Sequence, residues 1–167
     1  MKPAVLVVMG VSGSGKTTVG ALLAGRLGWG FQDGDDFHSA AMVEKMRGGT
    51  ALTDADRWPW LGRVAAWVDA TRAVGRHGVI VCSALRREYR DVVVGDRADV
   101  RLVYLQGDRA LIAARQAART GHYMPALLVE SQFAALEEPG ADERPITVSV
   151  VPGALEVVSA IVAQLGV

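Results

Sequence analysis

The stretch that decides the fold is Gly10-Val11-Ser12-Gly13-Ser14-Gly15-Lys16-Thr17. It matches the phosphate-loop pattern G-x-x-x-x-G-K-S/T at every fixed position. The apolar run 4–9 before it predicts a strand that is buried on both faces. Residues 16–27 after it carry apolar side chains at helical spacing. A strand, this turn and a helix in that order are the context in which the pattern binds a nucleoside triphosphate.

Each part of this loop has a physical role in binding phosphate. Its glycines allow a tight turn whose backbone N–H groups point at phosphate oxygens, and the helix N-terminus adds a favourable dipole. We expect Lys16 to reach the β- and γ-phosphates of ATP and the Thr17 hydroxyl to ligate Mg²⁺. The loop residues predicted to bind ATP are Gly10, Val11, Ser12, Gly13, Ser14, Gly15, Lys16, Thr17 and Thr18. The loop alone does not separate kinases from GTPases, motors or nucleotide-dependent switches.

The composition is that of an ordinary globular domain. The 167 residues suit a single domain spanning 1–167, and 50% of them are apolar. Lys plus Arg equals Asp plus Glu at 18 each, which favours neither a nucleic-acid nor a membrane partner. The single cysteine, Cys82, excludes an internal disulfide and is expected to be a buried apolar side chain. No apolar run is long enough for a signal peptide or a membrane span, so we expect a cytoplasmic protein.

Short apolar runs alternate with segments of helical period along the rest of the chain, which is typical of an α/β fold with a parallel sheet. The predicted strands cover 4–9, 29–32, 79–82, 102–105 and 146–150. The predicted helices cover about 16–27, 39–47, 54–74, 109–119, 126–136 and 155–165. We expect Ser39 and Asp108 to cap two of these helices and Gly28 to end the first.

Two carboxylates, Asp33 and Asp35, follow the second predicted strand, at the edge where ligands of open α/β sheets gather. The second strand commonly lies beside the first. If it continues through the pair, both carboxylates point to one side. One of them could hold a metal-bound water while the other accepts the proton of an attacking hydroxyl. The alternative is a simple acidic turn, because Asp-Gly is a common turn pair, but the nearby phosphate loop favours the functional interpretation.

Arginines supply the candidate contacts to an anionic acceptor. Arg57 is a candidate clamp for a substrate carboxylate, because a guanidinium group binds carboxylates with paired hydrogen bonds. Its neighbours Trp58 and Trp60 are expected in the core. Ser83 and Arg86 follow the third strand, where a small residue permits close approach of a ligand and a cation can meet its charge. The alternative for Arg86 is a solvated helical face that it shares with Arg87 and Arg90.

A third group, Arg115, Arg119 and His122, lies where a predicted helix gives way to a break over 120–125. Arg115 and Arg119 are four residues apart, so they share a helix face and repel each other unless an anion lies between them. Phosphoryl transfer needs cations around the transferring group, often delivered by a closing lid. Both arginines are therefore candidate cations around the transferring group. His122 is a candidate substrate ligand, with a solvated loop histidine as the alternative.

Taken together, these strings resemble the gluconate kinase (gluconokinase) family of P-loop kinases, which is related to shikimate and adenylate kinases. The combination of DGDxxH, DxDRxPWL and CSAL is far more specific than the widely shared phosphate loop. The matching pieces run in family order over most of the chain: Gly10–Thr17 (GVSGSGKT), Asp33–His38 (DGDDFH), Leu52–Leu61 (LTDADRWPWL), Val81–Asp91 (VCSALRREYRD), Gly121–Tyr123 (GHY), Ser131-Gln132-Phe133 (SQF) and Leu136–Glu143 (LEEPGADE).

The resemblance implies a three-layer P-loop NTPase fold, with a five-stranded parallel sheet flanked by helices and a small mobile lid at about 119–127. It implies transfer of the ATP γ-phosphoryl to the 6-hydroxyl of D-gluconate, with Mg²⁺, for gluconate use through the pentose phosphate route. Family members often form homodimers. The stretch from Pro139 onward is expected near the adenine. The implied catalytic residues are Lys16, Asp35 and Arg119; the implied substrate ligands are Asp35, His38, Arg57, Ser83, Arg86 and His122; the implied metal ligands are Thr17 and Asp33.

Three positions depart from the family pattern. Arg86 stands where a lysine often follows CSAL, Tyr123 stands where the lid often has phenylalanine, and the third strand ends in Cys82-Ser83 without a Walker-B aspartate. Two other functions remain open on the residues alone. One is a kinase for another small polyhydroxy acid such as shikimate, and the other is a nucleotide-binding switch without phosphoryl transfer, which the acidic pair disfavours.

Overall fold

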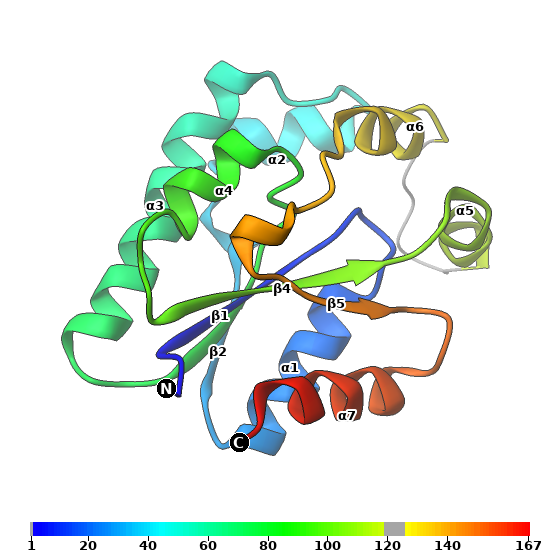
Figure 1. Cartoon of the computed structure of the whole chain (residues 1–167). Coiled ribbons are helices and arrows are strands. Elements are labelled where there is room, and N and C mark those ends of the chain that lie inside the picture. Colours follow the sequence, from blue (N-terminus) through cyan, green and yellow to red (C-terminus); the bar gives the residue numbers. More distant parts are fainter. Residues whose placement is uncertain (1, 119–125) are drawn as a thin grey trace.

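The chain forms three layers, in which a parallel sheet lies between two layers of helices (Figure 1). The structure, a computed structural model, describes residues 2–118 and 126–167. The sheet has five strands in the order β2-β3-β1-β4-β5, and all neighbouring pairs are parallel. They are β1 (Val5–Met9), β2 (Gly30–Asp33), β3 (Gly78–Val81), β4 (Val100–Gln106) and β5 (Ile146–Ser149). The predicted α/β fold with five parallel strands is confirmed.

The helices follow the predicted ranges closely, except that the helix at Arg87–Val93 was not predicted. They are α1 (Lys16–Leu27), α2 (Ala40–Arg47), α3 (Asp54–Ala73), α4 (Arg87–Val93), α5 (Arg109–Ala118), α6 (Ala126–Ala135) and α7 (Ala154–Leu165), with short 3-10 turns η1 (Gly34–Phe37) and η2 (Ala141–Glu143). The Ser39 hydroxyl accepts from the Met42 N–H at 3.3 Å, and the Asp108 carboxylate accepts from the Leu111 N–H at 2.8 Å. Both predicted caps are therefore confirmed, as is the left-handed Gly28 that ends α1.

β1 lies at the centre of the sheet and is buried on both faces. Leu6 and Val8 pack in the core formed with α1 and α7, while Val5, Val7 and Met9 pack in the core formed with α3 and α4. Figure 1 shows the same division, with α1 and α7 on one side of the sheet and α3 and α4 on the other. A strand covered by helices on both faces must be apolar throughout, which is why its sequence does not alternate. The loop after β1 therefore starts from a rigid, central strand.

β2 corrects one expectation, because it does not lie beside β1. β3 pairs with β1, and β2 pairs only with β3 at the edge of the sheet. Burial accounts for this order: every residue of β3 is buried, whereas Gly30 and Phe31 in β2 are exposed. The turn after β3 therefore lies between the phosphate loop and the end of β2, where it can contribute to a site that both of them share.

Trp58 and Trp60, near the start of α3, differ in burial, and the expectation for one of them was wrong. Trp60 is 2% exposed, whereas Trp58 is 40% exposed and meets Tyr89 edge-on at 5.6 Å between ring centroids. Residues two apart on a helix point about 200° apart, so only one of the pair can face the sheet. Cys82 is buried as expected, and burial raises the pKa of its thiol to about 12.

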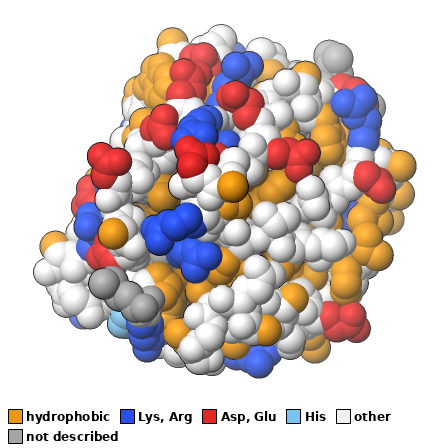
Figure 2. Space-filling model, viewed as in Figure 1, with side chains coloured by type: hydrophobic (Ala, Val, Ile, Leu, Met, Phe, Trp, Pro, Cys, Tyr) orange, Lys and Arg blue, Asp and Glu red, His pale blue; other side chains and the backbone are white. Residues whose placement is uncertain are grey.

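The surface carries charges of both signs close together. Figure 2 shows Lys and Arg side chains interspersed with Asp and Glu on the face seen in Figure 1, and the chain as a whole has zero formal net charge. Many of these charges are paired; for example, the Arg97 guanidinium binds both carboxylate oxygens of Asp69 at 2.7 and 2.8 Å. Among residues 2–118 and 126–167, no helix is both long enough and apolar enough to cross a membrane.

Candidate active site

The phosphate loop has the backbone shape that its glycines predict. Gly13 and Gly15 both have φ of +89°, a left-handed conformation that other residues adopt only with strain. A side chain at Gly13 would also place its Cβ 2.8 Å from Cγ of Gln116. Inside the loop, the Ser14 hydroxyl donates to the Val11 carbonyl at 2.7 Å. The loop leads directly into α1, so backbone N–H groups at this helix N-terminus are oriented for an anion.

Two glutamines fasten the phosphate loop from outside. Gln116 on α5 is 8% exposed, and its side-chain amide donates to the Ser12 hydroxyl at 3.1 Å. Gln132 on α6 accepts the backbone N–H of Ser12 through its side-chain oxygen. The Ser12 N–H thus already points at an acceptor oxygen, as a phosphate-binding N–H must. Neither glutamine was predicted to have a role; the only signal in the sequence was that Gln132 belongs to the SQF string.

Thr17 and Asp33 come together as the metal prediction requires. The Thr17 hydroxyl donates to one carboxylate oxygen of Asp33 at 3.0 Å, and the other oxygen accepts the backbone N–H of Asp35 at 2.9 Å. A hydroxyl and a carboxylate are hard oxygen ligands of the kind that Mg²⁺ takes, with water and phosphate completing its shell. Among the described residues, no group of three or more His, Cys, Asp and Glu side chains could hold a metal ion. The two side chains therefore fit a partly hydrated magnesium ion bound with phosphate.

The acidic pair is arranged differently from the extended strand that was considered. β2 ends at Asp33, and Asp35 lies in the 3-10 turn η1, so the two carboxylates do not follow a period of two. The Asp35 side chain is 72% exposed, and one of its oxygens lies 3.7 Å from Nε2 of His38. Interaction with the His38 ring lowers the pKa of Asp35, and the charge of Lys16 adds to this shift. Asp35 is thus a carboxylate at neutral pH.

A cavity of about 340 Å³ joins the phosphate loop to the residues predicted to bind the acceptor. This volume lies in the range of natural small-molecule sites. The polar side chains in its wall that come from predicted site residues are Ser12, Lys16, Asp35, His38, Arg57 and Ser83. They come from the phosphate loop, η1 and the residue after it, α3 and the turn after β3, so four separate segments converge on one space. Gln132, which holds Ser12, also lines it.

His38 presents an unsatisfied polar atom in this region. Its side chain is 3% exposed and its ring stacks on Trp60, with 4.2 Å between centroids. Trp60 is itself anchored, because its indole N–H donates to the Gly34 carbonyl at 2.7 Å. Within the described part of the chain, Nδ1 of His38 is buried and has no hydrogen-bond partner. Buried polar atoms normally have a partner, so this nitrogen is an exception beside the cavity.

Arg57, which lines the cavity, is held in place by Tyr89. Its guanidinium lies 5.5 Å from the Tyr89 ring centroid, and one nitrogen donates to the Tyr89 hydroxyl at 3.3 Å. The Tyr89 hydroxyl in turn donates to Asp54, which also lies 3.9 Å from Arg57. Only 23% of the Arg57 side chain is exposed, so the cation is directed by neighbours and not by solvent. A cation fixed in this way suits a carboxylate.

Comparison with known proteins identifies the family of this chain. A family profile described as an AAA domain matches residues 5–139. The gluconokinase of Gluconobacter oxydans (strain 621H) is 50% identical over 89% of this chain and 84% of that protein. The chain belongs to the gluconokinase family. The thermosensitive gluconokinase of Escherichia coli (strain K12) is 45% identical over 84% of this chain and 75% of that protein. A solved gluconokinase structure from Sinorhizobium meliloti 1021 has a TM-score of 0.89 at 39% identity, covering 98% of this chain and 92% of that one.

Two described residues that the gluconokinase resemblance assigned to the site, Arg86 and Arg115, do not line the cavity. Arg86 is exposed at the start of α4 and does not line the cavity. Arg115 on α5 donates to the Val151 carbonyl at 3.3 Å. Arg119 and His122, and most of the lid expected at 119–127, lie outside the described residues, so their roles stay predictions. Arg90 corrects the solvated-face alternative, because its side chain is 2% exposed.

Proposed function

We propose that this gluconokinase-family chain transfers the γ-phosphoryl group of ATP to the 6-hydroxyl of D-gluconate. The observation that carries the proposal is the cavity that places Lys16 of the phosphate loop in one space with Asp35, His38 and Arg57. A phosphate-binding lysine, a carboxylate and a fixed arginine are what a kinase acting on an anionic polyol needs. The products are ADP and 6-phospho-D-gluconate, which enters the pentose phosphate route.

The nucleotide occupies the phosphate loop, with the N–H groups of residues 10–17 around its phosphates. Lys16 places a positive charge against the γ-phosphoryl oxygens, where negative charge must be tolerated during transfer. Thr17 and Asp33 would hold Mg²⁺, which neutralises phosphate charge when it is bound. Arg115 and Arg119 stay further candidate cations for the phosphates; Arg119 and most of the lid predicted at 119–127 lie outside the described residues. The segment from Pro139 onward is the predicted adenine side.

The acceptor occupies the cavity with its two ends held differently. Arg57 binds the carboxylate, while Asp35 accepts a hydrogen bond from the 6-hydroxyl and orients it towards the γ-phosphorus. His38 and Ser83, which line the cavity, serve the hydroxyl groups between. In the transfer, the bond from the 6-oxygen to phosphorus forms, the bond from phosphorus to the β–γ bridging oxygen breaks, and the hydroxyl proton leaves to Asp35.

The state of Asp35 fits orientation better than strong basicity. Its pKa is lowered, so its affinity for a proton is weak. Phosphoryl transfer has a loose transition state in which the attacking hydroxyl loses its proton late, so positioning contributes more than early proton abstraction. We place the reaction in the cytoplasm, and a homodimer is the expected assembly. Arg86 and His122 stay predicted acceptor ligands of lower priority than Arg57, because Arg86 is exposed and His122 lies outside the described residues.

The purified protein with MgATP tests the proposal through ADP release. D-Gluconate is compared with shikimate, D-glucose, nucleoside monophosphates and no acceptor, and the phosphorylated position is read from the ³¹P and ¹³C spectra of the product. Turnover with gluconate alone and phosphate on carbon 6 are expected. ADP release that ignores gluconate, or that prefers another acceptor, would overturn the assignment of substrate while keeping the nucleotide site.

A further inference from the structure

The turn after β3 holds a residue in a strained conformation directly beside the acceptor cavity. Ala84 has φ of +43°, in the left-handed region that residues with a Cβ rarely adopt. Its neighbour Ser83 lines the cavity, and Ala84 itself is 1% exposed. Strained backbone persists only where surrounding interactions hold it, and it is common at functional sites. Specific interactions must therefore hold this turn.

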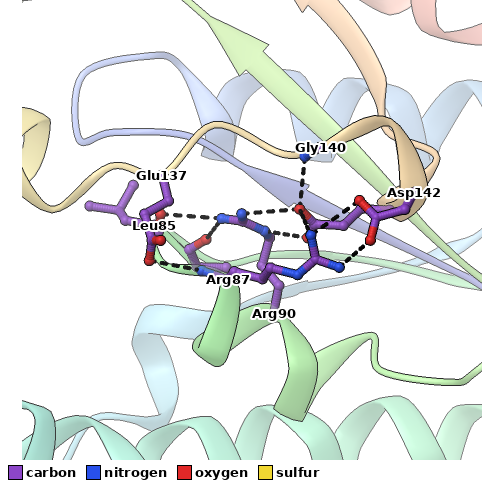
Figure 3. Close-up of polar contacts among 8 residues, drawn as sticks. Leu85, Arg87, Arg90, Glu137, Gly140 and Asp142 are labelled. Carbon is purple, nitrogen blue, oxygen red and sulfur yellow. Dashed lines mark hydrogen bonds and ion pairs between the residues drawn. The ribbon is translucent and has the colours of Figure 1, made fainter.

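Arg90 on α4 supplies them. One nitrogen of its guanidinium donates to the carbonyls of Ala84 and Leu85, at 3.0 and 3.2 Å. The other two nitrogens bind both carboxylate oxygens of Glu143, at 2.7 and 3.2 Å. Figure 3 shows this side chain reaching from α4 between the turn and the segment that carries Gly140 and Asp142. A buried arginine with every side of its fork occupied is a rigid support.

Glu143 extends the same network into the segment 137–143. One of its oxygens accepts the backbone N–H of Gly140 at 2.9 Å, and the Glu137 N–H donates to the Leu85 carbonyl at 2.8 Å. Burial opposes ionisation of Glu143, but hydrogen bonds from Arg90 and from the Gly140 N–H hold the pKa of this carboxyl below its usual value. The pair is therefore ionised, and removal of either charge would leave the other buried and unpaired.

We infer that Arg90 is a positioning residue for the acceptor site, because it holds the 83–85 backbone in the strained turn that presents Ser83 to the cavity. Arg90 does not line the acceptor cavity and touches no reacting atom. The inference rests on the proposed function, in which that cavity binds gluconate. It predicts a defect in gluconate binding that is separate from the binding of ATP.

Arg87 provides a matched control on the same helix. It pairs with Asp142 of the same segment through both of its terminal nitrogens, yet its side chain is 48% exposed and makes no hydrogen bond to the Ala84 or Leu85 carbonyls. Arg87→Lys and Arg90→Lys are thus the same chemical change, three residues apart and against the same segment. They differ in whether the turn beside the cavity loses its support.

Steady-state kinetics with D-gluconate and with MgATP, together with the melting temperature, form the test. Arg90→Lys keeps the positive charge for Glu143 but a single ammonium group cannot serve two carbonyls and two carboxylate oxygens. We expect its KM for gluconate to rise about tenfold, with the KM for MgATP within about twofold of wild type. Arg87→Lys is expected to leave both values within about twofold.

Three outcomes would decide against the inference: an Arg90→Lys protein with unchanged KM for gluconate, a rise in both KM values together, or an equal defect in Arg87→Lys. If Arg90→Lys does not fold, Glu143→Gln replaces it, since this change retains the carbonyl contacts but loosens the guanidinium, and a rise of about threefold in gluconate KM is expected. Absence of that rise would count equally against it. Wild-type protein that does not turn over gluconate would instead refute the proposed function.

Discussion

The phosphate loop and the acceptor cavity meet at Lys16, but they obtain their shapes from different kinds of interaction. The loop is one continuous run, Gly10–Thr17, whose turn follows from left-handed glycines and a hydrogen bond between Ser14 and Val11. The cavity is assembled from the loop, η1 and the residue after it, α2 and residues 50–52, α3, the turn after β3, and α6. Its key side chains are held by partners far along the chain, such as Tyr89, which binds Arg57 from 32 residues away.

This difference teaches where chemistry and specificity reside in a small kinase. The turn of the loop is encoded by its own glycines, so it can be shared by enzymes with unrelated acceptors, even though Gln116 and Gln132 fasten it to the rest of this fold. An assembled cavity depends on strand order and on supporting residues, so it can differ between relatives while the loop stays the same. Changes in the loop should therefore impair turnover with every acceptor, whereas changes in the supports of the cavity should impair gluconate binding alone.

Lys16→Met should have the largest effect. Loss of the ammonium removes a charge aimed at the γ-phosphoryl group, and we expect kcat to fall by about 10³-fold. ADP release with saturating gluconate measures it. Lys2→Met is the matched control, because Lys2 is exposed and lies 5.5 Å from the Trp29 ring centroid, away from the cavity wall. A Lys16→Met protein with more than a tenth of wild-type kcat would contradict the claim that the phosphate loop supplies the chemistry of transfer.

Asp35→Asn should come next, with a fall in kcat of about 10²-fold, because the amide orients the hydroxyl poorly and cannot take its proton. Asp36→Asn is the control from the neighbouring position: its carboxylate accepts from Gln32 at 3.3 Å and does not line the cavity. Single-turnover rates separate the chemical step from binding. Full ATP-dependent activity of Asp35→Asn toward gluconate would mean that the proposed mechanism is wrong.

Tyr89→Phe should have a smaller and more selective effect. The change removes the hydroxyl that accepts a hydrogen bond from Arg57 and donates one to Asp54. The Arg57 guanidinium is then held less firmly in its present orientation. We expect the KM for gluconate to rise about fivefold and the KM for MgATP to stay constant. Tyr104→Phe is the matched control, because that hydroxyl donates to Glu138 at 3.3 Å and not to a cavity residue. Equal effects of the two changes on the KM for gluconate would show that Tyr89 has no specific role in supporting the cavity.

The smallest effect concerns pH. The folded-state pKa of Glu143 lies below its ordinary value of 4.5, so its contribution to stability is full above that pH and is lost as the pH falls through the folded pKa. Glu143→Gln cannot lose this contribution. We expect the free energy of unfolding of wild type to fall more steeply below pH 4.5 than that of the variant. Urea denaturation of both proteins at several pH values between about 3 and 7 measures the free energy of unfolding. Parallel plots of this free energy against pH would contradict the prediction.

The sequence predicted the local features well and the assembled ones only in part. The phosphate loop, the five parallel strands and the capped helices all follow from periodicity, glycines and capping residues, each within a few positions. The pairing of Thr17 with Asp33 was implied only by resemblance, and the structure brings the two side chains into contact. The expected position of β2 beside β1 was wrong, because the hydrophobic pattern of a strand does not say which strands are its neighbours in the sheet.

The supports of the site could not be predicted because their partners are distant. Gln116 binds Ser12 across 104 residues, and Ser12 binds Gln132 across 120. Arg90 and Glu143 are 53 residues apart, and each looked like an ordinary surface charge in its own helix or turn. Only the fold reveals that these polar side chains are buried and paired, since neither periodicity nor local spacing encodes such a partner.

The most direct test of the assembled acceptor site compares D-gluconate with its neutral analogue D-gluconamide in Arg57→Gln and Arg86→Gln proteins. Arg57 lines the cavity, whereas Arg86 is exposed and does not. The ratio of kcat/KM for the acid over the amide reports the contact with the carboxylate. We expect this ratio to fall at least tenfold in Arg57→Gln and to stay within about twofold of wild type in Arg86→Gln. A ratio that collapses in Arg86→Gln and persists in Arg57→Gln would contradict the account.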